Sequence, residues 1–197
     1  MAEQNDARRA DQGLGPGAYF FDLCLLNQHR LMRGANDEEK RAKLIEALRN
    51  CLVGCGHVLL CCAQGPSGVG WETPAPFVRI WCLFEIYKSL EIGVPITMQL
   101  GAEEQQEFRA ALQQGGLARV NVALDKVNAR EAGATMEDDK RDILADIERT
   151  VGLDEFNERV RGALKSEYAR IATRASFRWA PFSNPGFLAY EFFPEEI

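Results

Sequence analysis

The feature that most constrains the fold is one stretch of chain between residues 57 and 100. An apolar run at 57–62 predicts a buried strand, and a loop rich in Gly, Pro and Ser follows at 63–76. Trp71 in this loop is expected to be an exposed aromatic residue. Apolar residues then recur at helical spacing over 77–92, and a second apolar run follows at 94–100. A strand that reaches a neighbouring strand through a helix predicts a parallel pair, so this stretch indicates a βαβ unit.

The other predicted elements extend this pattern on both sides. Strands are predicted over 19–26 and 119–124, and helices over 102–114, 137–151, 154–171 and from Asn36 to the glycines Gly54 and Gly56. Strands that alternate with helices predict an α/β fold with a parallel sheet of at least three strands and helices on both faces. The helices after residue 125 are predicted to form a C-terminal helical extension.

The domain organisation follows from composition along the chain. With 197 residues, of which 46% are hydrophobic, the chain is long enough for one domain with a sizeable core. We expect a flexible lead-in at 1–17, an α/β domain at 18–125, helices packed on it at 126–173, and an irregular tail at 174–197. The tail is rich in aromatic residues, proline and acids.

The charge of the chain argues against several classes of partner. A net charge of −6 argues against a nucleic-acid groove, which needs clustered Lys and Arg. No apolar run approaches the roughly 18 residues that a membrane span requires. The first eleven residues are polar and carry no signal-peptide core. These features predict a cytoplasmic protein that binds neither nucleic acid nor a membrane.

The cysteines are predicted to pack in the core. A reducing compartment disfavours disulfides among the six cysteines, and Cys61 and Cys62 lie inside an apolar run. The alternative is a metal site built from Cys51, Cys55, His57 and Cys61. That spacing matches no standard zinc pattern, so no metal is expected.

The motif residues resemble a known family. They are Phe21 and Asp22 in a predicted strand, the strand 57–62, the sequence Arg79-x-Trp81-Cys82-x-x-Glu85, and Val94-Pro95-Ile96. Together they resemble a Toll/interleukin-receptor (TIR) domain, whose third helix often begins with Trp-Cys-x-x-Glu, most plainly in plant resistance proteins. The end of the strand 19–26 is more similar to TIR-like domains of algal and protist proteins. The resemblance covers residues 18–125 and implies a flavodoxin-like, three-layer fold.

The resemblance also implies a chemistry for the motif. In enzymatic TIR domains the motif glutamate cleaves the nicotinamide–ribose bond of NAD, which implies Glu85 as catalytic residue, NAD as substrate and no required cofactor. A carboxylate stabilises the oxocarbenium character that develops as such a bond breaks. Trp81, one helical turn earlier, would wall the pocket or stack on nicotinamide. The alternatives are a surface acid near a helix N-terminus for Glu85 and a core position for Trp81.

Three further residues are candidates for ligand contacts. Asp22 is an acid within an apolar strand, so it is either a ligand contact at the strand end or half of a buried ion pair with Arg79 or Arg30. His29 follows the same strand, at the edge where α/β folds place ligands, although a plain loop histidine is the simpler interpretation. Arg79 opens the motif and is the third candidate.

Two departures from the family pattern shape the functional prediction. Residues 1–17 contain no strand, so the first family strand is predicted to be missing from this chain, and residues 27–36 do not match the family's BB loop. Both would spoil a nucleotide pocket. The sequence therefore favours a signalling module that associates with itself or other proteins through its acidic surface and aromatic tail. Nucleotide binding is an additional property that the TIR resemblance implies. An NAD glycohydrolase is the alternative.

Overall fold

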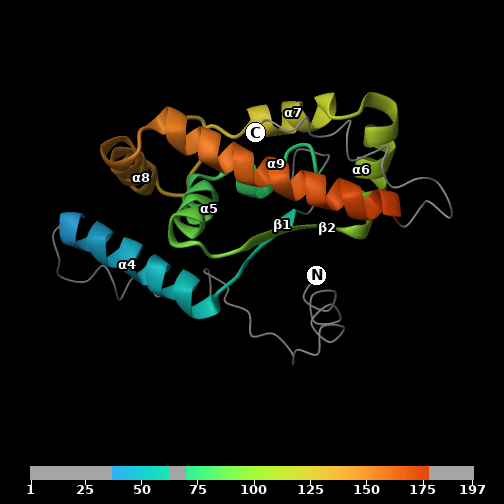
Figure 1. The fold of residues 1–197 in the computed structure, drawn as a ribbon. Coiled ribbons are helices and arrows are strands. Elements are labelled where there is room, and N and C mark those ends of the chain that lie inside the picture. Colours follow the sequence, from blue (N-terminus) through green and yellow to red (C-terminus); the bar gives the residue numbers. More distant parts are fainter. Residues whose placement is uncertain (1–36, 63–69, 178–197) are drawn as a thin grey trace, which may run out of the picture. The chain divides into compact units, whose positions relative to one another are not determined.

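The computed structural model describes residues 37–62 and 70–177, a mixed α/β structure that is mostly helical (Figure 1). The chain divides into two compact units. Among the described residues, the first unit comprises 37–60 and 84–99, and the second comprises 61–62, 70–83 and 100–177. The predicted lead-in 1–17 and strand 19–26, and nearly all of the predicted tail, lie outside the described residues.

The first unit begins with the predicted N-terminal helix, α4 (Asp37–Cys55). Leu44, Leu48 and Leu52 recur at helical spacing and are buried, which explains why this stretch is helical. The helix ends as the backbone N–H of Gly56 donates to the carbonyl of Leu52, with Gly56 at φ 64°. A left-handed residue at this position is the common glycine stop of a helix, so the predicted end is confirmed.

The sheet consists of two parallel strands among the described residues, β1 (Val58–Cys62) and β2 (Ile96–Leu100). Both were predicted, and they are joined through helix α5 (Ile80–Ile92), as a βαβ unit requires. The N–H of Val58 donates to the carbonyl of Pro95 at 2.9 Å. Pro95 precedes β2 and contributes only its carbonyl, so its missing N–H leaves no gap in the ladder.

One predicted strand is wrong. Residues 119–124 lie in a helix, α7 (Ala118–Asp125), whose buried side chains are Val120, Ala123 and Leu124. Their spacing of three and four residues is the helical period, and Val122 between them is 58% exposed. The short alternation of Val and Asn is compatible with both the strand period of two residues and the helical period. Packing within the second unit stabilises the helix.

The second unit is built around the long helix α9 (Leu153–Phe177), which contacts α7, α8 (Glu137–Thr150) and α6 (Ala102–Gly115). Figure 1 shows α9 in orange to red, with α7 alongside it. The predicted helices 102–114, 137–151 and 154–171 are thereby confirmed, with α9 continuing into the segment that was predicted as tail. The helices of the described part are too short or too polar to cross a membrane.

Trp71 was predicted as an exposed loop aromatic, and this is wrong, since it is 1% exposed. Its ring lies 5.2 Å from that of Phe108 in an edge-to-face pair, and the Arg119 guanidinium lies 5.4 Å from its centroid. The Tyr168 hydroxyl donates to the Trp71 carbonyl at 2.5 Å. A Gly- and Pro-rich sequence predicts a turn without showing what the turn packs against, which is why the sequence missed this anchor.

The residues after Trp71 are anchored as well. The Lys126 ammonium donates to the Glu72 carbonyl at 3.0 Å and to the Thr73 hydroxyl at 2.5 Å, and Arg119 pairs with the Glu72 carboxylate. Burial raises the pKa of the Tyr168 hydroxyl, so it stays protonated and donates its hydrogen bond. Residues 70–74 are therefore fixed to α7 and α9.

Candidate functional site

The motif helix α5 begins at Ile80, three residues later than predicted. The preceding residues form a separate 3-10 turn, η1 (Ala75–Val78), which buries Phe77. Arg79 between them is extended, at φ −116° and ψ 124°, and is paired with Gly133 in an isolated parallel bridge. The break at Arg79 therefore follows from backbone pairing with a distant segment.

That segment, residues 127–139, is here called the strap. The Gly133 N–H donates to the Val78 carbonyl at 2.8 Å, and the Ile80 N–H donates to the Gly133 carbonyl at 3.0 Å. The first N–H groups of a helix have no partner inside the helix. The strap thus supplies a backbone partner to the first residue of α5.

Trp81 is half-buried, and its indole N–H donates to the Asp139 carboxylate at 3.1 Å. Asp139 lies in the first turn of α8, beside Glu137 and Asp138. Sequence reasoning missed Asp139, because an acidic first turn is explained by the helix dipole alone and nothing local links it to Trp81. The interpretation of Trp81 as a core residue is correct only in part, since one edge of its ring makes a polar contact.

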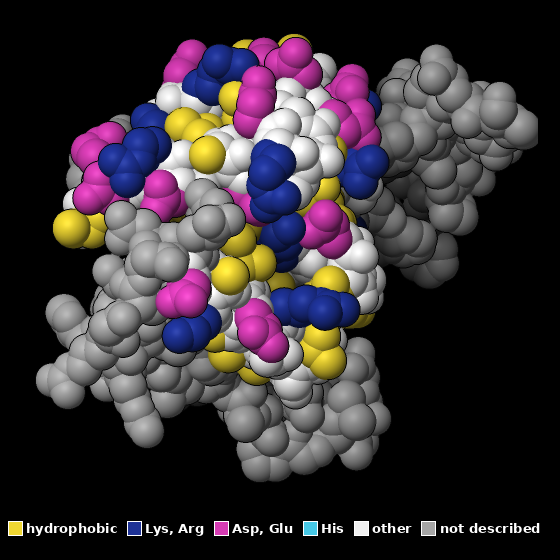
Figure 2. Space-filling model, turned by 90° about the vertical axis from the view of Figure 1, so that its left-hand side faces the viewer, with side chains coloured by type: hydrophobic (Ala, Val, Ile, Leu, Met, Phe, Trp, Pro, Cys, Tyr) yellow, Lys and Arg dark blue, Asp and Glu magenta, His cyan; other side chains and the backbone are white. Residues whose placement is uncertain are grey.

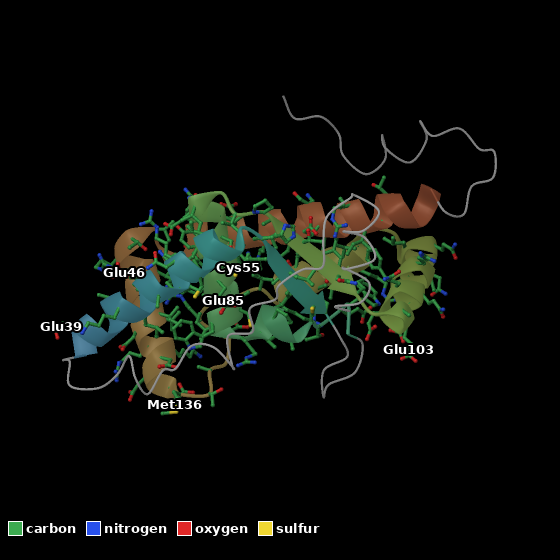
Figure 3. The ribbon with its side chains drawn as sticks, turned by 90° about the horizontal axis from the view of Figure 1, so that it is seen from below. Glu39, Glu46, Cys55, Glu85, Glu103 and Met136 are labelled. Carbon is green, nitrogen blue, oxygen red and sulfur yellow. The ribbon has the colours of Figure 1, made fainter. Side chains whose placement is uncertain are left out.

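Glu85 lies on α5 (Figure 3). It follows Trp81 by one helical turn and is half-buried. Its neighbours in sequence, Phe84 and Ile86, are buried, and its backbone carbonyl accepts a hydrogen bond from the Ser89 hydroxyl at 2.7 Å. The carboxylate is therefore on the boundary of the apolar side of the helix. This position is compatible with a ligand contact and with a structural role.

The remaining candidates are not gathered with these residues by the described structure. Arg79 is exposed. Asp22 and His29 fall in the part of the chain that the structure does not describe, so the predicted pairing of Asp22 with Arg79 or Arg30 stays a prediction. What the structure does bring together is Trp81 with Asp139, and Arg79 with Gly133.

The cysteines divide by burial. Cys62 is fully buried, and burial, followed by the nearby Cys61, Glu104 and Cys82, raises the pKa of its thiol to about 12. Core packing was also predicted for Cys61 and Cys55, and for both it is wrong, because they are exposed. Alternate residues of β1 point to opposite faces, so Cys61 cannot share the buried side of Cys62.

The described residues show no grouping for a metal ion, and the second unit holds a small cavity. Within residues 37–62 and 70–177, no group of three His, Cys, Asp or Glu side chains is placed to hold a metal ion. A small cavity of about 10 Å³ lies among α6, α7 and α9, lined mainly by apolar residues such as Phe108, Val120 and Tyr168. That volume holds about one water, so this cavity is a packing gap.

No family model, curated protein or solved structure matches this chain. The TIR resemblance therefore remains a prediction from the motif residues.

Proposed function

We propose that this chain is a TIR-like signalling module that acts by associating with copies of itself, with nucleotide binding as an added property of the motif helix. The support begins with the βαβ unit of β1, α5 and β2, in which Trp81 and Glu85 occupy the first two turns of the helix. This is the context in which the family carries its motif.

The main support for the proposal is that N–H groups at the start of α5 are hydrogen-bonded within the chain. The Ile80 N–H donates to Gly133, and the Trp81 indole N–H donates to Asp139. Free N–H groups at a helix start are what a protein offers to a bound phosphate. Here the backbone N–H of Ile80 already has a partner within the chain, and so does the side-chain N–H of Trp81, so the start of α5 contributes to the fold. A domain that functions through protein contacts on its surface does not need these N–H groups for a ligand.

The surface is compatible with protein contacts. Figure 2 shows one face on which Lys and Arg side chains are interspersed with Asp and Glu, with apolar atoms between them. Among the described residues, Val53 on α4 and Val122 on α7 are about three-fifths exposed, at 60% and 58%. Mixed polar and apolar surface of this kind is ordinary for transient protein interfaces.

Self-association predicts that the average mass of the protein in solution rises with its concentration and needs no nucleotide. Sedimentation of the full chain over a wide concentration range measures it. Sedimentation as a monomer throughout that range would contradict the proposal.

A second candidate, an NAD glycohydrolase, is favoured by the position of Glu85. The side chain is half-buried in the second turn of α5, where a carboxylate keeps contact with a bound molecule while partly shielded from water. Cleavage of the nicotinamide–ribose bond leaves positive charge on the ribose, and a fixed carboxylate stabilises that charge. Nicotinamide leaves with the bonding electrons, and water then adds to the ribose carbon and loses a proton to the solvent.

For this candidate, Glu85→Ala is expected to lower the rate of nicotinamide release by about a hundredfold or more, because the stabilising charge is lost. Glu91→Ala is the matched control. Glu91 lies on the same helix, is exposed and pairs with Lys88 at 2.7 Å. Nicotinamide release from concentrated protein and NAD is measured for wild type and both variants. Equal rates in wild type and Glu85→Ala would remove the assignment.

A further inference from the structure

We infer that Asp139 is a positioning residue for Trp81, and that the strap couples the motif helix to the C-terminal helices. The functional consequence of this coupling rests on the proposed nucleotide binding of the motif helix. The coupling itself rests on contacts within the second unit.

The hydrogen bond between the two side chains restrains the ring. The indole N–H of Trp81 donates to Oδ2 of Asp139 at 3.1 Å across 58 residues of sequence. An ionised carboxylate makes a stronger acceptor than a neutral group, and Asp139 in the first turn of α8 is further stabilised by the helix dipole. The ring of Trp81 therefore has a preferred orientation on α5.

The strap that leads to Asp139 is held at its start by α9. The Arg161 guanidinium donates twice to the carbonyl of Val127, at 3.1 Å and 2.8 Å. The N–H of Ala129 donates at 2.9 Å to the side-chain oxygen of Asn157, which is 8% exposed. Val127 and Ala129 are themselves fully buried, so this end of the strap is fixed by polar and apolar contacts together.

The strap is held again where it meets α5. Gly133 makes its two backbone hydrogen bonds there, with Val78 and Ile80, and Ala132 beside it is buried. The strap thus reaches α5 at two neighbouring points, the backbone of Ile80 and the side chain of Trp81. The consequence is that helices beyond residue 125, outside the part that resembles a TIR domain, set the orientation of the motif tryptophan.

The orientation of Trp81 matters because a ring that stacks on a nucleotide base or a nicotinamide must present its face. A ring already restrained by Asp139 loses less conformational freedom when it binds such a molecule. Asp139 itself does not contact the bound molecule. Its role is to hold Trp81.

The test is the indole N–H resonance of Trp81 in full-length protein labelled with ¹⁵N. The chain has three tryptophans, and Trp81→Phe identifies the resonance. Asp139→Ala is expected to shift this resonance and to raise its exchange with water about tenfold, because a hydrogen bond to a charged group is lost. Asp139→Asn keeps a side-chain oxygen as acceptor and is expected to retain part of the protection. The control is Asp138→Ala, since Asp138 is exposed and pairs with Arg141.

The buried Trp71 reports whether each variant is folded. A Trp81 resonance that is unchanged in position and exchange in a folded Asp139→Ala protein would overturn the inference. If Asp139→Ala also disturbs the Trp71 resonance, the Trp81 resonance of Asp139→Asn is used as the test instead. A shift of the Trp81 resonance alone supports the inference, and no shift overturns it.

Positioning is judged from protein without NAD, whereas the proposed function is judged from self-association and nicotinamide release. Failure of one is therefore distinguishable from failure of the other. If wild type binds NAD, the Trp81 resonance is expected to shift on addition of NAD, by less in Asp139→Ala than in wild type at equal NAD concentration.

Discussion

Trp71→Ala is expected to lower the free energy of unfolding by about 3–5 kcal/mol, the usual cost of removing a large buried aromatic side chain. Trp71 is 1% exposed, pairs with Phe108 and lies under the Arg119 guanidinium. Truncation removes these contacts together and leaves a void that the surrounding helices fill only in part. The size of the effect follows from the position of Trp71, which joins residues 70–74 to α6, α7 and α9.

Urea denaturation followed by circular dichroism measures the change. Val122→Ala is the control, because Val122 is 58% exposed on α7 and its truncation is expected to change stability by less than about 0.5 kcal/mol. A loss for Trp71→Ala no larger than that of Val122→Ala would show that Trp71 is not part of the core.

Gly133→Pro is expected to lower the free energy of unfolding by about 2–3 kcal/mol. Proline has no N–H, so the 2.8 Å hydrogen bond to the Val78 carbonyl is lost. At the start of α5 the strap then keeps the hydrogen bond from the Ile80 N–H to the carbonyl of residue 133 and the hydrogen bond from Trp81 to Asp139. The unfolding midpoint in urea, with its slope checked for two-state behaviour, gives the value.

Gly133→Ala is the matched control because it keeps the N–H. A Cβ at this position would lie 3.7 Å from the Val78 carbonyl oxygen, an ordinary contact, so a change within about 1 kcal/mol is expected. Equal stability of the Pro and Ala variants would show that the hydrogen bond from Gly133 does not hold the strap.

Where a signal was local, the sequence predicted the structure well. The helices α4, α6, α8 and α9 follow from apolar spacing, and for α4, α6 and α8 a glycine just past the helix also marked the end. The strands β1 and β2 follow from short apolar runs between turns. A βαβ unit with the motif on its helix was predicted correctly for the same reason. The full flavodoxin-like sheet depends on the strand 19–26, which the described residues do not include.

Where the outcome depended on distant contacts, sequence reasoning failed. Residues 119–124 fitted two periods, and packing against α6 and α9 selected the helix. Trp71 lies in a turn sequence, yet its burial depends on Phe108 and Tyr168 far along the chain. The contact of Asp139 with Trp81 has no periodicity or spacing that could reveal it, because it joins the starts of two helices through the strap.

Sedimentation velocity of the full chain over a hundredfold range of concentration tests self-association most directly. A self-associating module is expected to show an average sedimentation coefficient that rises with concentration in the absence of NAD. It is expected to release no nicotinamide when NAD is added. A single monomeric species at every concentration would contradict self-association. Monomeric protein that nevertheless releases nicotinamide would support the alternative, an NAD glycohydrolase with Glu85 as its catalytic residue.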